Sequence, residues 1–347
     1  MTPRERVLRT LSGEKPNKVP YEFGLTPKLQ EEFEKRTGAK NPAKYYDFDI
    51  RSVKPAATQI NRDFSQYLPE LPEGTTVDEW GVAQVPGSEF HFTKRIHPLR
   101  ELTEVGELKD YPFPDRDADY RFEGMKEEID RLHEEGYFVD GFVGHIFETA
   151  WYMRGMENLL MDFYRNEEFA NHLLDKITEM NIAVAEKMAI LGCDMVRFGD
   201  DVGTQQGMMM DPQIWRKFLK PRLAKEIEKV RQINPDIHVW YHSDGDISRI
   251  IGELLEIGVD ILNPVQPECM DLLQIKEEYG DKLNLWGTIG TQSTMPFGTT
   301  EEVRETVKNN IEKLGYNGRL VLAPTHVLEP DVPWENVEAF IEVCEEF

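Results

Sequence analysis

The sequence has few of the residues that build disulfide frameworks or structural zinc fingers. Only three cysteines occur in 347 residues, and no two of them form a Cys-x-x-Cys pair. Sparse, widely spaced cysteines are typical of a chain that stays reduced. We therefore expect no disulfide bonds and no zinc ribbon built from Cys193, Cys269 and Cys344.

Long apolar runs and an excess of basic charge are also missing. The chain has no stretch of about 18 apolar residues, and its first residues lack the apolar core of a signal peptide. Lysine and arginine number 40 against 64 acidic residues, a formal net charge of −24. This charge would repel phosphates. We expect a soluble, cytoplasmic protein that binds neither nucleic acid nor a membrane.

Several sequence motifs of enzyme classes are absent. The chain contains no GxGxxG fingerprint, no GxxxxGK[ST] loop and no GxSxG elbow. Residues 130–136 superficially resemble the Asp-x-His-x-x-Gly motif that binds cobalamin, but Asp130 and His133 are one residue too far apart. We therefore expect no corrinoid bound within this chain.

What is present is an alternation of short apolar runs with helical patterns. Residues 211–232, for example, repeat apolar side chains every three or four positions. Such alternation predicts parallel βα units, and eight units predict an α/β fold of the (β/α)₈ TIM-barrel type. The expected strands are 19–23, 49–55, 137–144, 195–200, 237–242, 259–264, 283–288 and 319–324.

One region interrupts the alternation. Residues 56–125 are rich in proline, glycine and charge, and they include short aromatic runs such as SEFHFTKRI, residues 88–96. We expect an insertion after the second strand, partly hairpin, which either covers the barrel mouth or is an ordinary surface elaboration. With no repeat or long linker, residues 1–347 are predicted to form one domain.

Metal-binding side chains follow the fifth and eighth expected strands, where barrel enzymes place their chemistry. His242 and Asp244 are two residues apart, so in an extended segment both side chains point the same way. His326 ends the strand that faces them across the mouth. A His/Asp/His set would leave zinc an open position, as a catalytic site needs. Alternatively, each histidine is a hydrogen-bonded strand-end residue.

Acidic side chains follow two other strands. Asp200 and Asp201 are adjacent after the fourth strand, and in an extended chain only one of them can face inward, as a base or a substrate contact. Glu148 follows the third strand. It is either a second acid or metal-site carboxylate, or a first-turn helix residue that the helix dipole favours.

Short motifs are spread over nearly the whole chain. They are Arg4-Glu5-Arg6-Val7, Asp78-Glu79-Trp80-Gly81, Arg154-Gly155, Gly199-Asp200-Asp201-x-Gly203-x-Gln205, His242-Ser243-x-Gly245, Asn263-Pro264-Val265-Gln266-Pro267, Pro324-Thr325-His326 and Pro333-Trp334-Glu335-Asn336-Val337. Together they resemble the motifs of the uroporphyrinogen decarboxylase superfamily, and this resemblance implies a (β/α)₈ barrel.

The resemblance also separates two chemistries. Uroporphyrinogen decarboxylases proper carry an arginine-rich signature after the first strand, which binds a substrate with many carboxylates. The corresponding residues 21–27 contain no arginine and include Glu22. A carboxylate there would repel that substrate, so haem biosynthesis is not the expected function.

The other branch contains zinc-dependent methyltransferases that use a separate corrinoid protein. Its zinc ligands are a His-x-Cys pair and a cysteine near the C-terminus. His242 matches the histidine, whereas Asp244 and His326 stand where the two cysteines are expected. Oxygen and nitrogen ligands make zinc a harder Lewis acid, better matched to an oxygen than to a thiol. Residues 262–267 and 296–298 also resemble the subgroup linked to aryl methyl ether demethylation.

The resemblance thus implies a methyltransferase that moves a methyl group from a small methyl donor, a methoxylated aromatic, to a corrinoid protein. Zinc is expected on His242, Asp244 and His326, and Glu148, Asp200 and His242 are the expected catalytic residues. A homodimer is compatible with the resemblance. Expected substrate contacts are Tyr21, Glu22, Phe147, Asp201, Gln205, Asn263, Gln266, Trp286 and Gln292.

Three alternatives stay open at this point. A metal-independent decarboxylase or lyase of a small acid would use Asp200 and His242 as an acid/base pair. A methyltransferase could act on a thiol or an amine rather than an ether. A barrel that has lost both cysteine ligands could also be a non-catalytic small-molecule binding protein.

Overall fold

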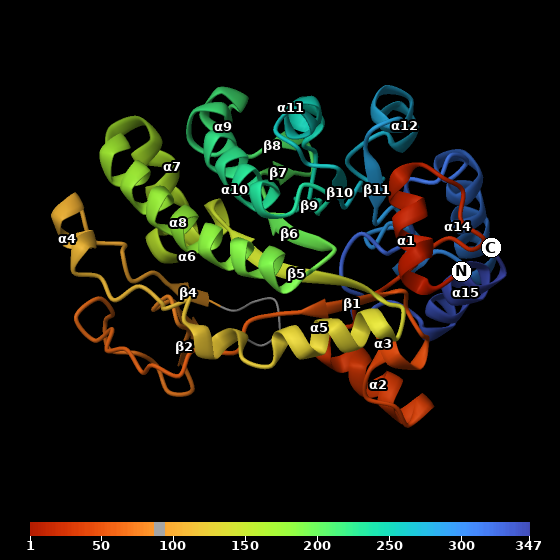
Figure 1. Ribbon diagram of the computed structural model, residues 1–347. Coiled ribbons are helices and arrows are strands. Elements are labelled where there is room, and N and C mark those ends of the chain that lie inside the picture. The colour runs from red at the N-terminus through yellow and green to blue at the C-terminus, as the bar shows by residue number, and fades with distance from the viewer. Residues whose placement is uncertain (87–93) are drawn as a thin grey trace.

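The computed structural model describes residues 1–86 and 94–347. Seven parallel strands form one curled sheet in the order β1-β5-β6-β9-β10-β11-β12, with helices along its outer face (Figure 1). The strands are β1 (Ile50–Val53), β5 (Phe138–His145), β6 (Met195–Gly199), β9 (His238–His242), β10 (Ile261–Asn263), β11 (Asn284–Trp286) and β12 (Leu320–Val321).

The first expected strand is reduced to a bridge beside β12. Tyr21 pairs in parallel with Leu322, and the Leu322 N–H donates to the Pro20 carbonyl at 2.9 Å. Pro20 has no N–H, so the ladder cannot be continued through it. The segment nevertheless occupies the eighth position of the barrel, and the predicted TIM-barrel fold is confirmed.

The helices begin and end where the sequence supplies caps. Thr2 with Glu5, and Thr299 with Glu302, form capping boxes. The helices are α1 (Pro3–Ser12), α2 (Pro27–Thr37), α3 (Pro42–Tyr45), α4 (Val105–Lys109), α5 (Met125–Glu134), α6 (Phe147–Arg154), α7 (Met156–Arg165), α8 (Glu167–Leu191), α9 (Pro212–Phe218), α10 (Lys220–Ile233), α11 (Ile251–Glu256), α12 (Leu272–Tyr279), α13 (Thr294–Phe297), α14 (Thr300–Leu314) and α15 (Trp334–Glu346), with short 3₁₀ turns at Asp119–Phe122 and Ser248–Ile250.

Two features of these helices concern the helical pattern of residues 211–232 and the possibility of a membrane-spanning helix. The helical pattern of residues 211–232 is divided into α9 and α10 at Leu219. In the described part of the chain, no helix combines the length and apolar character needed to cross a membrane.

Helix α1 closes the amino-terminal end of the barrel. Its Val7 and Leu11 are buried in one cluster with inward-facing residues of all seven strands of the sheet, among them Trp240 and Trp286. Because this end is filled by apolar side chains, space for a ligand lies toward the carboxyl ends of the strands.

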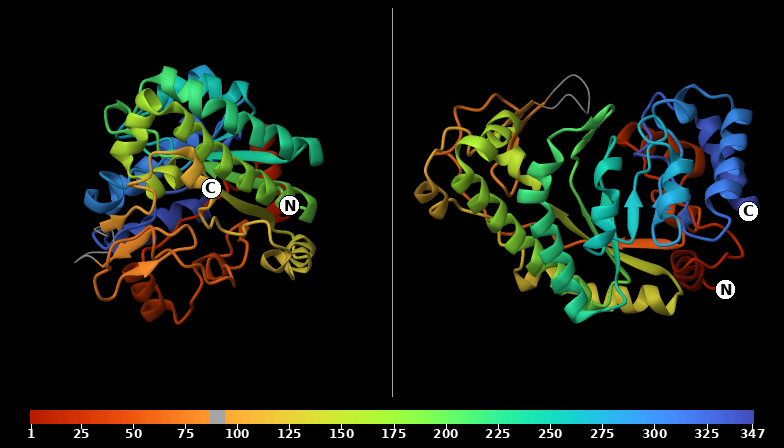
Figure 2. Two further views of the ribbon diagram at one scale, coloured as in Figure 1. Left: turned by 90° about the vertical axis from the view of Figure 1, so that its left-hand side faces the viewer. Right: turned by 90° about the horizontal axis from the view of Figure 1, so that it is seen from above.

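The insertion after β1 contains a small antiparallel sheet of β2 (Thr76–Val77), β3 (Ala83–Val85) and β4 (Lys94–Ile96). The expected hairpin is thus present, although residues 87–93 of the aromatic run lie outside the described residues. The insertion and the C-terminal helices α14 and α15 lie at opposite ends of the molecule (Figures 1 and 2).

Arg154, the last residue of α6, holds the insertion against the barrel. Its buried guanidinium donates to the carbonyls of Leu99 at 2.6 Å, Arg100 at 2.9 Å and Leu102 at 2.7 Å. The same group forms an ion pair with Asp162 of α7 at 2.7 Å. Three carbonyls of the insertion and one carboxylate of the barrel therefore share a single cation.

Candidate active site and metal centre

A cavity of about 330 Å³ opens at the carboxyl ends of the strands. Strand-end and inward-facing side chains line it, and no described residue of the insertion does. The chemistry-bearing lining residues are Glu22, Arg197, Trp240, His242, Trp286 and His326.

Three metal-ligating side chains gather beside this cavity: Asp201, His242 and Asp244, named here the open cluster. One ligand atom from each lies within 4.8 Å of the other two. The His242 Nε2 atom is 3.6 Å from Asp201 Oδ1 and 3.8 Å from Asp244 Oδ1. The exposed fractions of the side chains are 19% for His242, 35% for Asp201 and 38% for Asp244, so the cluster is reachable from solvent.

Backbone contacts between two loops place these side chains. Strands β6 and β9 pair in parallel with Gly199 opposite His242. Beyond the strands, a Cβ on Gly203 would lie 2.4 Å from the Asp244 carbonyl oxygen. Only glycine permits that approach, which brings the loop of Asp201 against the loop of Asp244. The Asp244 N–H then donates to Asp201 Oδ1 at 2.8 Å.

The tautomer of a neutral His242 ring follows from its neighbour Asn263. The Asn263 amide nitrogen donates to the Trp286 carbonyl at 3.0 Å, which turns the amide oxygen toward His242. That oxygen is 2.7 Å from His242 Nδ1 and can only accept a hydrogen bond. The Nδ1 atom therefore carries the proton, and the lone pair of a neutral ring lies on Nε2, facing the two carboxylates.

This arrangement fits a divalent cation. Two carboxylates and one neutral imidazole leave a charge of about −2 around a single point, with all three donor atoms directed at it. Oxygen and nitrogen donors suit zinc, and a hydrogen-bond partner on the second ring nitrogen is typical of metal-binding histidines. In the described part of the chain no cysteine belongs to the cluster.

His326, a predicted zinc ligand, lies nearby but outside this group. It lines the same cavity as His242 and also a neighbouring cavity with Asp244. Its side chain is exposed at the rim. The structure thus brings His242 and Asp244 together, with Asp201 rather than His326 as the nearest third donor.

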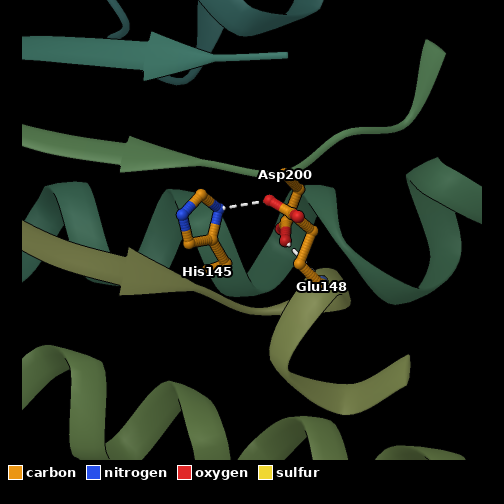
Figure 3. A group of neighbouring side chains, drawn as sticks. All are labelled: His145, Glu148 and Asp200. Atoms are coloured by element: carbon orange, nitrogen blue, oxygen red, sulfur yellow. Dashed lines mark hydrogen bonds and ion pairs between the residues drawn. The ribbon is translucent and has the colours of Figure 1, made fainter. Parts of the chain in front are cut away.

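A second group lies beside the first: His145, Glu148 and Asp200, named here the closed cluster (Figure 3). The His145 Nδ1 atom is 2.7 Å from Glu148 Oε2, and the Tyr152 hydroxyl donates to Glu148 Oε1 at 2.8 Å. The Glu148 N–H donates to Asp200 Oδ1 at 2.9 Å. Glu148 and Asp200 are both buried.

The two carboxyl groups of the closed cluster have opposite pKa shifts. Burial alone would raise the pKa of Glu148, but the hydrogen bond and charge of His145 hold it at about 2. Burial raises the pKa of Asp200 to about 8, despite the attraction of His145 and a hydrogen bond from the Glu148 N–H. One group is thus an anion and its neighbour a neutral acid at pH 7.

Several predicted substrate contacts lie at the cavities. Glu22 and Trp286 line the main cavity together with Asn263. The three predicted glutamines instead line the neighbouring cavity of about 260 Å³ that contains Asp244 and His326; they are Gln205, Gln266 and Gln292.

Two predicted contacts lie outside the described cavity. Tyr21 is buried between Phe48 and Phe340, and its hydroxyl donates to Glu345 at 2.6 Å. Phe147 is fully buried and stacks on Phe163. Both rings belong to the packing between barrel and helices, and neither lines the described cavity; a contact of either ring with substrate stays a prediction.

Sequence reasoning missed three residues of this region. It did not single out His145, although this residue follows a strand and precedes Glu148 by three positions. It also missed Tyr152, one helical turn after Glu148, and the cavity position of Arg197. The first two carried a weak spacing signal. The inward direction of Arg197 followed from no pattern that we recognised.

The chain is similar in sequence to one family and to several characterised proteins. Residues 2–347 match the sequence pattern of the family described as uroporphyrinogen decarboxylase (URO-D). A methylcobamide:CoM methyltransferase (MtaA) of Methanosarcina barkeri is 28% identical over 174 residues, which is 50% of this chain and 48% of that protein. A uroporphyrinogen decarboxylase of Chlorobaculum tepidum is 23% identical over 264 residues, 73% of this chain and 72% of that protein.

A solved structure has the same architecture. The methyltransferase from Methanosarcina mazei superposes with a TM-score of 0.69 at 20% identity, over 100% of this chain and 99% of that chain. At this identity the similarity shows a shared fold. The alignments span about half the length of the methylcobamide:CoM methyltransferases that they match.

Proposed function

The chain belongs to the uroporphyrinogen decarboxylase family, and from this premise we propose that it is a zinc-dependent methyltransferase. It moves a methyl group between a small methylated substrate and a separate corrinoid protein. The substrate that we propose is a methoxylated aromatic, which the enzyme O-demethylates. The observation that carries the proposal is the open cluster, a set of oxygen and nitrogen donors beside a cavity with aromatic walls.

The donor set supports the choice of an ether. Asp201, His242 and Asp244 would hold the zinc ion, with His326 at the rim as a further candidate ligand. A zinc ion bound by these groups supplies a Lewis acid for an ether oxygen. A thiolate-free set is a hard one, and it matches oxygen better than sulfur.

The protein's own residues would position the substrate. Trp240 and Trp286 line the cavity and offer flat apolar surface to an arene. Asn263 fixes the His242 ring, so its Nε2 atom stays directed at the ion. In the closed cluster Glu148 forms an ion pair with His145 and accepts a hydrogen bond from Tyr152, and we assign Glu148 the task of holding both side chains in place beside the site.

The partner would approach the barrel mouth. The cavity opens at the carboxyl ends of the strands, and α1 fills the other end. A corrinoid protein that exchanges a methyl group with a substrate in this cavity must therefore dock over the mouth.

Metal analysis and a transfer assay test the proposal together. Plasma mass spectrometry on tag-free protein should find about one zinc per chain, lost in His242→Ala. With a reduced corrinoid protein, the wild type should demethylate a methoxyarene and His242→Ala should not. Protein without zinc, combined with unchanged activity of His242→Ala, would refute the proposal. His326→Ala, measured in parallel, tells whether His326 is also a ligand.

A thiol-directed methyl transfer is a second candidate, because a relative is named as a methylcobamide:CoM methyltransferase. The absence of cysteine from the open cluster, among the described residues, is the observation against it. Offering methylated corrinoid with a thiol acceptor distinguishes the two: rapid thiol methylation and no ether cleavage would favour this candidate.

A decarboxylase is a third candidate, favoured by Asp200. Its carboxyl group, with a pKa of about 8, is a neutral acid near the cavity at pH 7. Release of carbon dioxide from a small acid without metal or corrinoid would support it. Glu22, beside the cavity, disfavours the substrate of uroporphyrinogen decarboxylases, which carries many carboxylates.

A further inference from the structure

Arg197 faces two carboxyl groups, that of Glu22, which lines the cavity, and that of the buried Asp140. Arg197 Nη2 lies 2.8 Å from Asp140 Oδ2, a carboxylate whose side chain is only 1% exposed. The same nitrogen is 3.5 Å from both oxygens of Glu22. The short contact pairs Arg197 with Asp140, and the Ser52 hydroxyl adds a further hydrogen bond to Asp140 at 2.9 Å. Glu22 therefore has only a weak, long contact with the Arg197 guanidinium.

Tryptophan side chains fix this geometry. The Arg197 guanidinium lies 4.9 Å from the ring centre of Trp240 and 5.2 Å from that of Trp286. The two indoles meet edge to face at 6.4 Å. The Trp286 indole N–H donates to Glu22 Oε1 at 3.0 Å. Arg197 therefore cannot swing toward Glu22 without leaving both rings and Asp140.

One oxygen of Glu22 remains underused as an acceptor. Within the described residues, Oε2 has only the 3.5 Å contact to Arg197, which is too long for a normal hydrogen bond. Glu22 lines the cavity, and 23% of its side chain is exposed. A carboxylate oxygen in this position gains most from a new donor, because charged acceptors form the stronger hydrogen bonds.

We propose that Glu22 selects the substrate by its non-reacting end: the cavity accepts molecules that end in an uncharged hydrogen-bond donor, such as a phenolic hydroxyl, and rejects those that end in a carboxylate. The inference rests on the proposed function only in assigning the methylated substrate to this cavity. A substrate carboxylate would be a third anion beside Glu22 and Asp140. An ammonium group would lie against Arg197. A neutral donor avoids both repulsions and satisfies Glu22.

Direct binding tests this selection without any methyl transfer. Quenching of tryptophan fluorescence should report occupancy, because Trp240 and Trp286 line the cavity. The probes are 3-methoxyphenol, methoxybenzene and 3-methoxybenzoate. Each is titrated with and without a chelator, so that binding of the benzoate carboxylate to a metal ion can be distinguished from its binding to the cavity. We expect 3-methoxyphenol to bind about tenfold or more tightly than either of the others.

Substitution of Glu22 should change the order of the three probe affinities. Glu22→Gln should weaken 3-methoxyphenol about tenfold and improve 3-methoxybenzoate, because the anion is gone. Glu31→Gln, an exposed substitution on α2, is the matched control and should change nothing. Trp286→Phe frees Oε1 of its indole donor but keeps the charge, so the preference for the phenol should persist. This variant keeps the test open if Glu22→Gln does not fold.

The outcomes separate the inference from the proposed function. Equal or tighter binding of 3-methoxybenzoate, an unchanged order in Glu22→Gln, loss of the preference in Trp286→Phe, or no binding of any probe would overturn the inference. A clear preference for the phenol without demethylation in the corrinoid assay would leave the inference standing and refute the methyltransferase. Demethylation with 3-methoxybenzoate as the best donor would do the reverse.

Discussion

The open and closed clusters contain the same residue types, one histidine and two carboxylates, at neighbouring strand ends. They differ in how their hydrogen-bonding capacity is used. In the closed cluster, Glu148 forms an ion pair with His145 at 2.7 Å and accepts a hydrogen bond from the Tyr152 hydroxyl at 2.8 Å. In the open cluster, His242 Nε2 is 3.6 and 3.8 Å from the two carboxylates, distances that leave room for an ion between them.

The comparison teaches that ligand type alone does not define a metal site. A site needs donor atoms that converge and that keep a lone pair for the ion; Asp201 Oδ1, which accepts the Asp244 N–H, retains a second lone pair. In the closed cluster Glu148 is already paired with His145, so a cation would have to break a buried ion pair first. In the open cluster a cation removes repulsion instead. The following substitutions test this difference.

The largest effect is expected from two adjacent aspartates, one in each cluster. Asp201→Asn should weaken zinc binding by more than the roughly 10–100-fold that loss of a second-shell partner costs, because a charged ligand is removed. Asp200→Asn should leave zinc binding unchanged within about twofold. Competition titration with a chromophoric chelator measures both. Equal losses in the two variants would erase the distinction between the clusters.

For the free energy of unfolding, the larger loss is expected in the closed cluster rather than in the open one. Glu148→Ala removes a buried carboxylate and leaves His145 and Tyr152 without their partner, so the free energy of unfolding should fall by about 3 kcal/mol. Asp244→Ala, at a half-exposed position, should cost no more than about 0.5 kcal/mol in metal-free protein. Urea unfolding with a chelator present measures both values. A larger loss for Asp244→Ala would contradict the comparison.

At low pH, protonation of Glu148 in the closed cluster should lower the free energy of unfolding. Its pKa of about 2 lies below the ordinary value of 4.5, so its contribution is complete above pH 4.5 and is lost as the pH falls toward 2. Between pH 5 and pH 3 the wild type should lose about 2 kcal/mol more than Glu148→Gln, which has no such titration. Denaturant unfolding at the two pH values checks this. Parallel losses in both proteins would show that the His145 pair is not formed.

The smallest effect concerns Asn263, which holds the His242 ring. Asn263→Ala should weaken zinc binding roughly tenfold, because Nδ1 loses its acceptor. Asn284→Ala is a matched buried asparagine, bonded to the Asp260 carbonyl and remote from the cluster, and should leave zinc affinity unchanged. If both variants bound zinc like the wild type, the orientation of His242 would not depend on Asn263.

The fold was accessible from the sequence because buried parallel strands form short apolar runs, and each run is separated from the next by a helix or a loop. One shortfall is the segment around Tyr21, where Pro20 prevents a longer ladder. The division of residues 211–232 into α9 and α10 was also missed, although Pro221 lies in the first turn of α10.

The site was accessible only in part. His242 and Asp244 are two residues apart, and in an extended segment such residues point the same way. This local rule predicted their proximity without any tertiary information. The proximity of Asp201 depends on the register of β6 against β9 and on the contact of Gly203 with the Asp244 loop, which no local pattern specifies. The metal ligands themselves remain a prediction.

Arg154 has a consequence for how the molecule opens. Its guanidinium joins residues 99–102 of the insertion to α6 and α7 through four partners. Segments that share buried bonds of this kind open together in native-state hydrogen exchange. The amides of residues 99–102 should therefore exchange with those of α6 and α7, as one cooperative unit, rather than with the independent kinetics of a surface loop.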